Sequence, residues 1–219
     1  MDIWLIRNQA MSAIASDLKA ENDTLLEALA LMDMGIEQLL AQAKGSSEQF
    51  AIVCCHTLIK AKRYALACYS VCLDGFAQEA GALYRPLVET WEQLIFYAQD
   101  PTRTQLAMDE RLPSAGEIAR AIGSELQGLR TYLNWNASHF SFREESLQSM
   151  QNAYNGEQLK TNLRVLYTTI WLTAREAASC LQTIGDLDDS FIAAINNSQE
   201  HGLKIFHIDD LASQQPENI

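Results

Sequence analysis

Prolines and glycines are scarce in this chain, at 4 and 10 of 219 residues. Both residues interrupt helices, so their scarcity allows helices to run long. No convincing alternating strand pattern and no internal repeat occurs, and 48% apolar residues suffice for a single core. The sequence therefore predicts an all-α fold: a bundle of four to five long helices with short peripheral helices.

Basic residues are also few, with 16 Lys and Arg against 28 Asp and Glu and a net charge of −12. Such an acidic chain is a poor general binder of nucleic acids or of membrane surfaces. The nearest exception is "KAKRY", with Lys60, Lys62 and Arg63. Since no uncharged apolar stretch approaches 18 residues, we expect no membrane association and a cytoplasmic protein. RNA is expected as a partner only if the chain is an enzyme.

Familiar cofactor and metal motifs are absent. The sequence has no glycine-rich dinucleotide loop, P-loop, G-x-S-x-G, C-x-x-C, E-x-x-H or H-E-x-x-H. It holds an odd number of cysteines, four of them in one helical pattern among apolar neighbours, which favours reduced, buried thiols. We expect no cofactor and no metal site. The cysteines are Cys54, Cys55, Cys68, Cys72 and Cys180.

Hydrophobic spacing and turn residues predict the order of the elements. Helices are expected at 23–43, 48–73, 77–99, 114 to about 133, 157–183 and 186–198. "DP" at Asp100–Pro101 ends the third, and Ser114 with Glu117 forms a capping box for the fourth. The organisation predicted from this pattern is a helical appendage at 1–22, a bundle domain at 23–205 and a mostly disordered tail at 206–219.

Arg85 and Glu89 are four residues apart within "ALYRPLVETWEQLIFYAQDP". Residues at this spacing share a helix face and can form an ion pair, which we expect to be largely buried. The favoured interpretation is a structural pair that joins neighbouring helices. The alternative is a small-molecule pocket lined by Arg85, Glu89 and Tyr97.

A second constellation lies in "RTYLNWNASHFSF", around His139. Imidazole titrates near neutral pH and can transfer protons during RNA cleavage, and arginine can stabilise a phosphorane. Arg130 and Arg143 flank this histidine in the sequence. The simpler interpretation is that His139 and the nearby asparagines satisfy carbonyls at a helix end.

Together, these two segments resemble a broad group of uncharacterised bacterial all-helical proteins, which are similar to HEPN domains. The "R-x-x-x-E" helix ending near "DP" is matched by Arg85, Glu89, Asp100 and Pro101, and the downstream cluster by Tyr132, Ser138 and His139. The resemblance covers roughly residues 50–180. It implies a helical bundle that dimerises, and many such proteins are metal-independent ribonucleases in toxin, stress and phage-defence systems. The catalytic motif of that family separates arginine from histidine by four to six residues, whereas eight separate Arg130 from His139.

Three functional hypotheses follow, and the sequence leaves open whether the chain is an enzyme. The first is a HEPN-like homodimeric module that works by binding, with a protein partner and a stress or phage-defence context. Its two-fold interface is expected near His139, where aromatic residues crowd. The second is an endoribonuclease using His139 with Arg130 or Arg143, and the third is the small-molecule binder. The predicted binding residues are Arg85, Glu89, Tyr97, Tyr132, Asn136 and Ser138.

Overall fold

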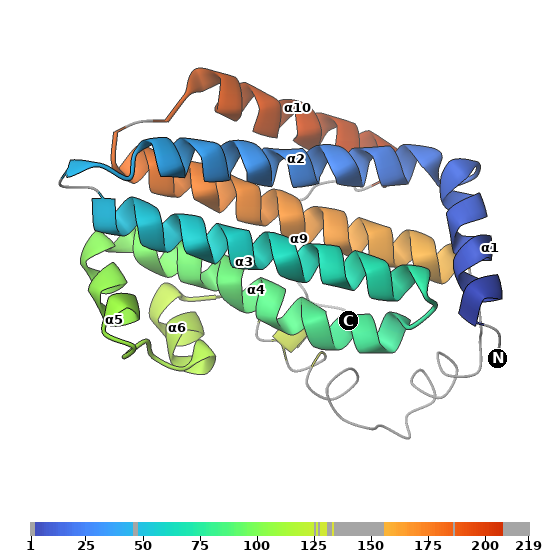
Figure 1. The fold of residues 1–219 in the computed structure, drawn as a ribbon, viewed down its shortest axis with the longest axis horizontal. Helices are drawn as coiled ribbons and strands as arrows, with labels where there is room; N and C mark the ends of the chain where they lie inside the picture. The colour runs from blue at the N-terminus through green and yellow to red at the C-terminus, as the bar shows by residue number, and fades with distance from the viewer. Residues whose placement is uncertain are drawn as a thin grey trace.

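Four long helices form where hydrophobic residues recur at helical spacing, and they lie side by side as a bundle (Figure 1). They are α2 (Lys19–Ala41), α3 (Glu48–Leu73), α4 (Ala77–Gln99) and α9 (Gly156–Thr183). The computed structural model describes residues 3–45, 48–124, 126, 128–130, 133, 156–185 and 187–207. Every element in these ranges is helical, which confirms the predicted all-α bundle.

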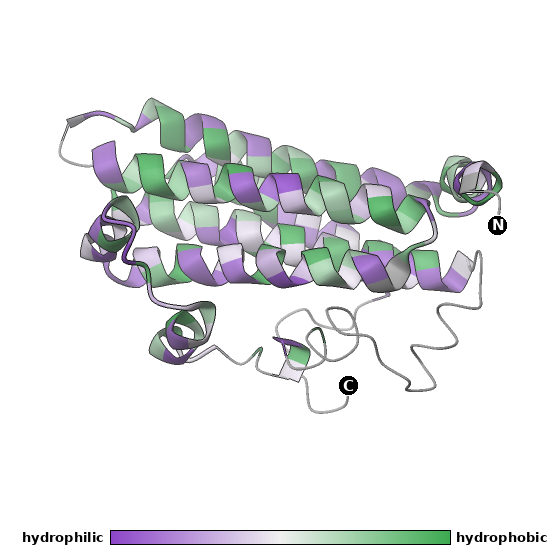
Figure 2. Cartoon of the chain, turned by 60° about the horizontal axis from the view of Figure 1, so that its bottom comes forward, coloured by the Kyte–Doolittle hydropathy of each residue, from purple (hydrophilic) through white to green (hydrophobic). Residues whose placement is uncertain are grey.

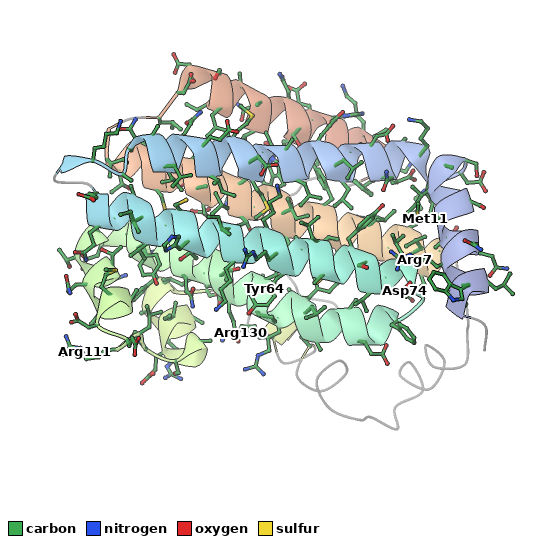
Figure 3. The ribbon with its side chains drawn as sticks, in the orientation of Figure 1. Arg7, Met11, Tyr64, Asp74, Arg111 and Arg130 are labelled. Carbon is green, nitrogen blue, oxygen red and sulfur yellow. The ribbon has the colours of Figure 1, made fainter. Side chains whose placement is uncertain are left out.

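Shorter helices surround this bundle. α1 (Ile3–Ala15) crosses one end of it, and α10 (Asp189–Ile205) covers α2 and α9 (Figure 1). The 3₁₀ turn η2 (Pro101–Arg103), α5 (Thr104–Met108) and α6 (Ala115–Ile122) follow α4. An ion pair between Arg7 and Asp74, 2.6 Å apart, ties α1 to the turn after α3 (Figure 3). None of the described helices is long and apolar enough to cross a membrane.

The core lies between α2, α3, α4 and α9. Hydrophobic and hydrophilic residues are intermixed along each long helix (Figure 2). Hydrophobic residues from all four helices form the buried core. α1 adds Ala10 and Ile14 to this core, and Leu18, which directly precedes α2, adds a third side chain. Residues 19–22, placed in the appendage from sequence, form the first turn of α2. The largest fully buried aliphatic side chains are Leu25, Met32, Leu39, Leu58, Leu87, Leu94, Ile118, Leu163 and Leu166.

The predicted bounds of α3 and α4 are confirmed. Turn-forming residues flank both helices in the sequence, which made their ends predictable. After α4, Asp100 adopts an extended conformation before Pro101, and its carboxylate accepts a hydrogen bond from the Thr102 N–H (3.1 Å). The predicted helix from 114 to about 133 was wrong in its end, since α6 stops at Ile122. Gly123 follows in the left-handed conformation at φ 66°, which ends the helix.

α10 extends beyond the predicted 186–198, to Ile205. It lies so close to α9 that a Cβ on Gly202 would be 2.1 Å from the hydroxyl oxygen of Tyr167. That hydroxyl donates a hydrogen bond to the Ser198 carbonyl (2.5 Å), and the Tyr167 ring stacks on Phe206. Gly202 is therefore a contact point between two helices rather than a helix stop. Phe206, placed in the predicted tail, is buried.

Candidate functional site

Polar side chains gather along one face of α4. Arg85, Glu89 and Glu92 recur at spacings of four and three residues, so they share that face. Ser124 and Arg130, which follow α6 in the chain, meet it from outside the helix. We refer to these five residues as the α4 charge cluster.

The outer pair of the cluster is Arg85–Glu89. The Arg85 Nε donates a hydrogen bond to Glu89 Oε1 at 2.9 Å, so the predicted pair is present. The expectation that it is largely buried was wrong, because 42% of the Arg85 side chain and 23% of the Glu89 side chain are exposed. Helical spacing brings two side chains together but does not fix their burial, and a long arginine can extend its charged end into water.

The inner pair is Glu92–Arg130. Arg130 Nη1 lies 3.2 Å from Glu92 Oε2 and 3.4 Å from Oε1, and the Ser124 hydroxyl donates to Oε1 at 2.6 Å. Only 1% of the Glu92 side chain and 14% of the Arg130 side chain are exposed. Arg130 lies along the lower edge of α4 in Figure 3. This pair therefore joins α4 to a segment 38 residues away in the chain.

Burial dominates the electrostatics of Glu92. Removing its carboxylate from water raises the pKa of Glu92 above the ordinary 4.5, and the charge of Glu89 adds to that rise. The hydrogen bond from Ser124 and the charge of Arg130 oppose it without cancelling it. Oε2 has no hydrogen bond of good geometry among the described residues. The surroundings of Glu92 thus disfavour its charged form, and one cation and one hydroxyl partly offset that effect.

A helix end places Ser124 against α4. The capping box of α6 is present, with the Ser114 N–H donating to Glu117 Oε2 at 2.8 Å. At the other end, Gly123 turns the chain so that the Ser124 hydroxyl points at Glu92. The same hydroxyl oxygen accepts a hydrogen bond from the Leu126 N–H (3.3 Å). The glycine after Ile122 was the sequence signal that could have located this end of the helix.

The predicted small-molecule site is not assembled as expected. Tyr97 is almost fully buried in the core, so it does not join the partly exposed Arg85–Glu89 pair. Burial also raises the pKa of Tyr97 to about 12. One shallow groove, of about 410 Å³, lies between the C-terminal part of α4 and α9. Its lining does not include Arg85, Glu89 or Tyr97; it comprises Ile95, Ala98, Gln99, Glu176, Ser179, Gln182 and Thr183.

Comparison with protein-family models, with curated proteins and with solved structures gives no match.

The remaining predicted site residues lie outside the described residues. They are Tyr132, Asn136, Ser138, His139 and Arg143, together with the aromatic neighbours Trp135, Phe140 and Phe142. Their proposed roles stay predictions. Of the predicted catalytic residues the structure places Arg130, and it places that guanidinium against Glu92. Glu92 and Ser124 were missed from sequence, although Glu92 stands three residues after Glu89 on the same face.

The thiols are free and buried, as predicted, and none pairs in a disulfide. Burial raises the pKa of the Cys72 thiol to about 12 and that of Cys68 further. The pKa of Cys180 is raised by a hydrogen bond with Cys54 and by burial. The thiols of Cys68, Cys72 and Cys180 therefore stay protonated at neutral pH and are poor nucleophiles. In the described part of the chain, no group of three or more His, Cys, Asp and Glu side chains is arranged to hold a metal ion.

Proposed function

We propose that this protein is a HEPN-like, homodimeric binding module of the cytoplasm, rather than a nuclease. The observation that carries the proposal is the Glu92–Arg130 pair. A guanidinium that stabilises a phosphorane must meet the phosphate with its donors free. Arg130 is instead mostly buried and already neutralised by a carboxylate. This arrangement supports a structural role for Arg130 and weakens the ribonuclease alternative that uses it.

Other features support the same proposal. The net charge of −12 repels RNA on average, and the buried, protonated thiols offer no ready nucleophile. The binding role fits the resemblance to HEPN bundles, and a stress or phage-defence setting follows from that resemblance alone. A ribonuclease would then have to rely on His139 and Arg143.

An RNA-cleavage assay tests the proposal. The wild-type protein is incubated with a mixture of structured and single-stranded RNAs in the presence of a chelator, next to His139→Ala, Arg143→Ala and Arg130→Ala. We expect no turnover above background from any of the four. Cleavage by the wild type that disappears in His139→Ala would overturn the proposal in favour of the ribonuclease. Light scattering on the same samples is expected to report a dimer.

A further inference from the structure

Two neighbouring helices carry hydrophobic residues that are exposed or half-buried at a regular interval. On α2, Leu26 and Leu40 flank Asp33 at steps of seven residues, and on α3 Ile52, Ile59 and Leu66 follow the same step. Seven residues span about two helical turns, so each set lies along one face of its helix. The exposed fractions of Leu26, Leu40 and Leu66 are 48%, 52% and 45%. A seven-residue hydrophobic repeat is typical of a helix that meets another helix.

The two rows lie next to each other at matching heights. α2 and α3 run antiparallel and side by side (Figure 1). Their register is set by a hydrogen bond from the Tyr69 hydroxyl to Asn22 (2.6 Å) and by the Lys62–Asp33 ion pair. Counting residues from these two contacts, Leu26 of α2 lies at about the same height along the helix pair as Leu66 of α3.

By the same register Leu40 stands level with Ile52, and Asp33 with Ile59. The result, called here the α2–α3 face, has hydrophobic residues at both ends and an ion pair in the middle. It comprises Leu26, Asp33 and Leu40 of α2 with Ile52, Ile59, Lys62 and Leu66 of α3.

Charge is divided between the same two helices. After Lys19, every charged residue of α2 is acidic, and after Glu48 every charged residue of α3 is basic. Asp33 and Glu37 are exposed on α2, while Lys60 and Arg63 are exposed on α3. A short acidic stretch of α2 therefore lies beside one basic turn of α3.

We propose that the α2–α3 face binds a second copy of this chain about a two-fold axis parallel to the helices. This inference rests on the proposed homodimer and names its surface, which replaces the interface near His139 that the sequence led us to expect. Such an axis places α2 of each copy over α3 of the other at equal height. Leu26 then meets Leu66 of the second copy, Leu40 meets Ile52, and Asp33 meets Ile59, within one helical turn of Lys62. Each contact occurs twice, as a closed two-fold interface requires.

The charges select this arrangement over the other two-fold packing. An axis perpendicular to the helices would stack α2 on α2 and oppose acidic residues to acidic ones, which is repulsive. The parallel axis brings the acidic stretch of α2 close to the basic turn of α3 in the other copy. The size also fits: a face two helices wide along α2, which is about 34 Å long, offers roughly 700 Å² per copy. Stable interfaces of ordinary size bury about 800 Å² per partner.

A charge-complementation experiment tests the surface and its geometry together. Leu26→Lys and Leu66→Asp are made in separate full-length chains, with Met108→Asp as a matched control on an exposed methionine of α5. Far-ultraviolet circular dichroism checks folding, which should survive because both leucines are about half exposed. Light scattering over a concentration series measures the dimer. Each variant alone should dimerise at least roughly tenfold more weakly than the wild type, because a charge is buried against a leucine.

Mixing the two variants decides the geometry. In a mixed dimer of the proposed arrangement, the lysine introduced in one copy faces the aspartate introduced in the other, and the second contact keeps both leucines, so dimerisation should recover. Two variants that dimerise like the wild type, or a mixture that stays monomeric, would overturn the inference and leave the homodimer standing. A wild-type chain that is monomeric at high micromolar concentration would overturn the homodimer as well. Loss of the dimer in Trp135→Ala, with Leu26→Lys unaffected, would move the interface to the region of His139.

Discussion

Two arginine–glutamate ion pairs lie less than two turns apart on α4, but they differ in exposure and in the sequence separation of their partners. Arg85–Glu89 is formed within the helix and remains open to water, whereas Glu92–Arg130 joins α4 to a distant segment and is nearly closed to it. Water screens the attraction within the first pair and would hydrate either charge if its partner were removed. In the second pair each charge depends on the other, because neither is well hydrated. Of the two pairs, Glu92–Arg130 is therefore the one that fixes the segment after α6 to α4.

The largest effect is expected from Glu92→Ala. This change leaves the Arg130 guanidinium mostly buried without its carboxylate and removes the acceptor of Ser124. Breaking one side of a buried pair costs about 3–5 kcal/mol of the free energy of unfolding. Urea denaturation followed by circular dichroism measures it, with Glu89→Ala as the matched control on the same helix face. A loss no larger than that of the control would erase the distinction between the two pairs.

The sequence predicts the long helices well because their limits are local signals. The bounds of α3 and α4 follow from three turn sequences, "KGSS" at 44–47, "DGF" at 74–76 and "DP" at 100–101. The capping box of α6 follows from Ser114 and Glu117. The errors arise at glycines. Gly123 ends α6 where the hydrophobic pattern suggested continuation, while Gly202 sits within α10 to admit the hydroxyl of Tyr167. Whether a glycine ends a helix or allows a close contact depends on a neighbour that the local sequence does not reveal.

The candidate site divides in the same way. The Arg85–Glu89 contact follows from helical spacing, but its exposure depends on what packs over α4. The Glu92–Arg130 contact has no local signal, since its partners are 38 residues apart. The buried thiols were predictable because apolar neighbours surround them at helical spacing.

A second, smaller effect concerns pH and Glu92→Gln. Because burial raises the pKa of Glu92, the folded state holds this proton more tightly than the unfolded state. The contribution of Glu92 to stability is therefore complete below the ordinary pKa of 4.5 and is lost as pH rises through the raised value. Glutamine does not titrate, so this loss should vanish in the variant.

Urea denaturation at a series of pH values between about 4 and 7 measures the difference between the two proteins. The wild type should lose stability relative to Glu92→Gln as pH rises. The comparison must be a difference, because the pKa values of Asp100, Asp109, Glu117 and Asp188 are lowered by hydrogen bonds and give the opposite slope in both proteins. Parallel curves would show that the pKa of Glu92 is not raised on folding.

The smallest effect is expected at the outer pair, where a double-mutant cycle separates the pair from the other contacts of each side chain. Arg85→Ala, Glu89→Ala and the double variant are compared with the wild type by urea denaturation. The interaction free energy should be about 0.3–0.5 kcal/mol, as for exposed pairs four residues apart on a helix, and should fall in high salt. The charge of Glu89 also helps to raise the pKa of Glu92. In Glu89→Ala, the loss of stability that accompanies ionisation of Glu92 should therefore occur at lower pH than in the wild type. An interaction free energy above about 2 kcal/mol would instead place the outer pair in the class of buried pairs, since hydration could no longer be supporting its charges.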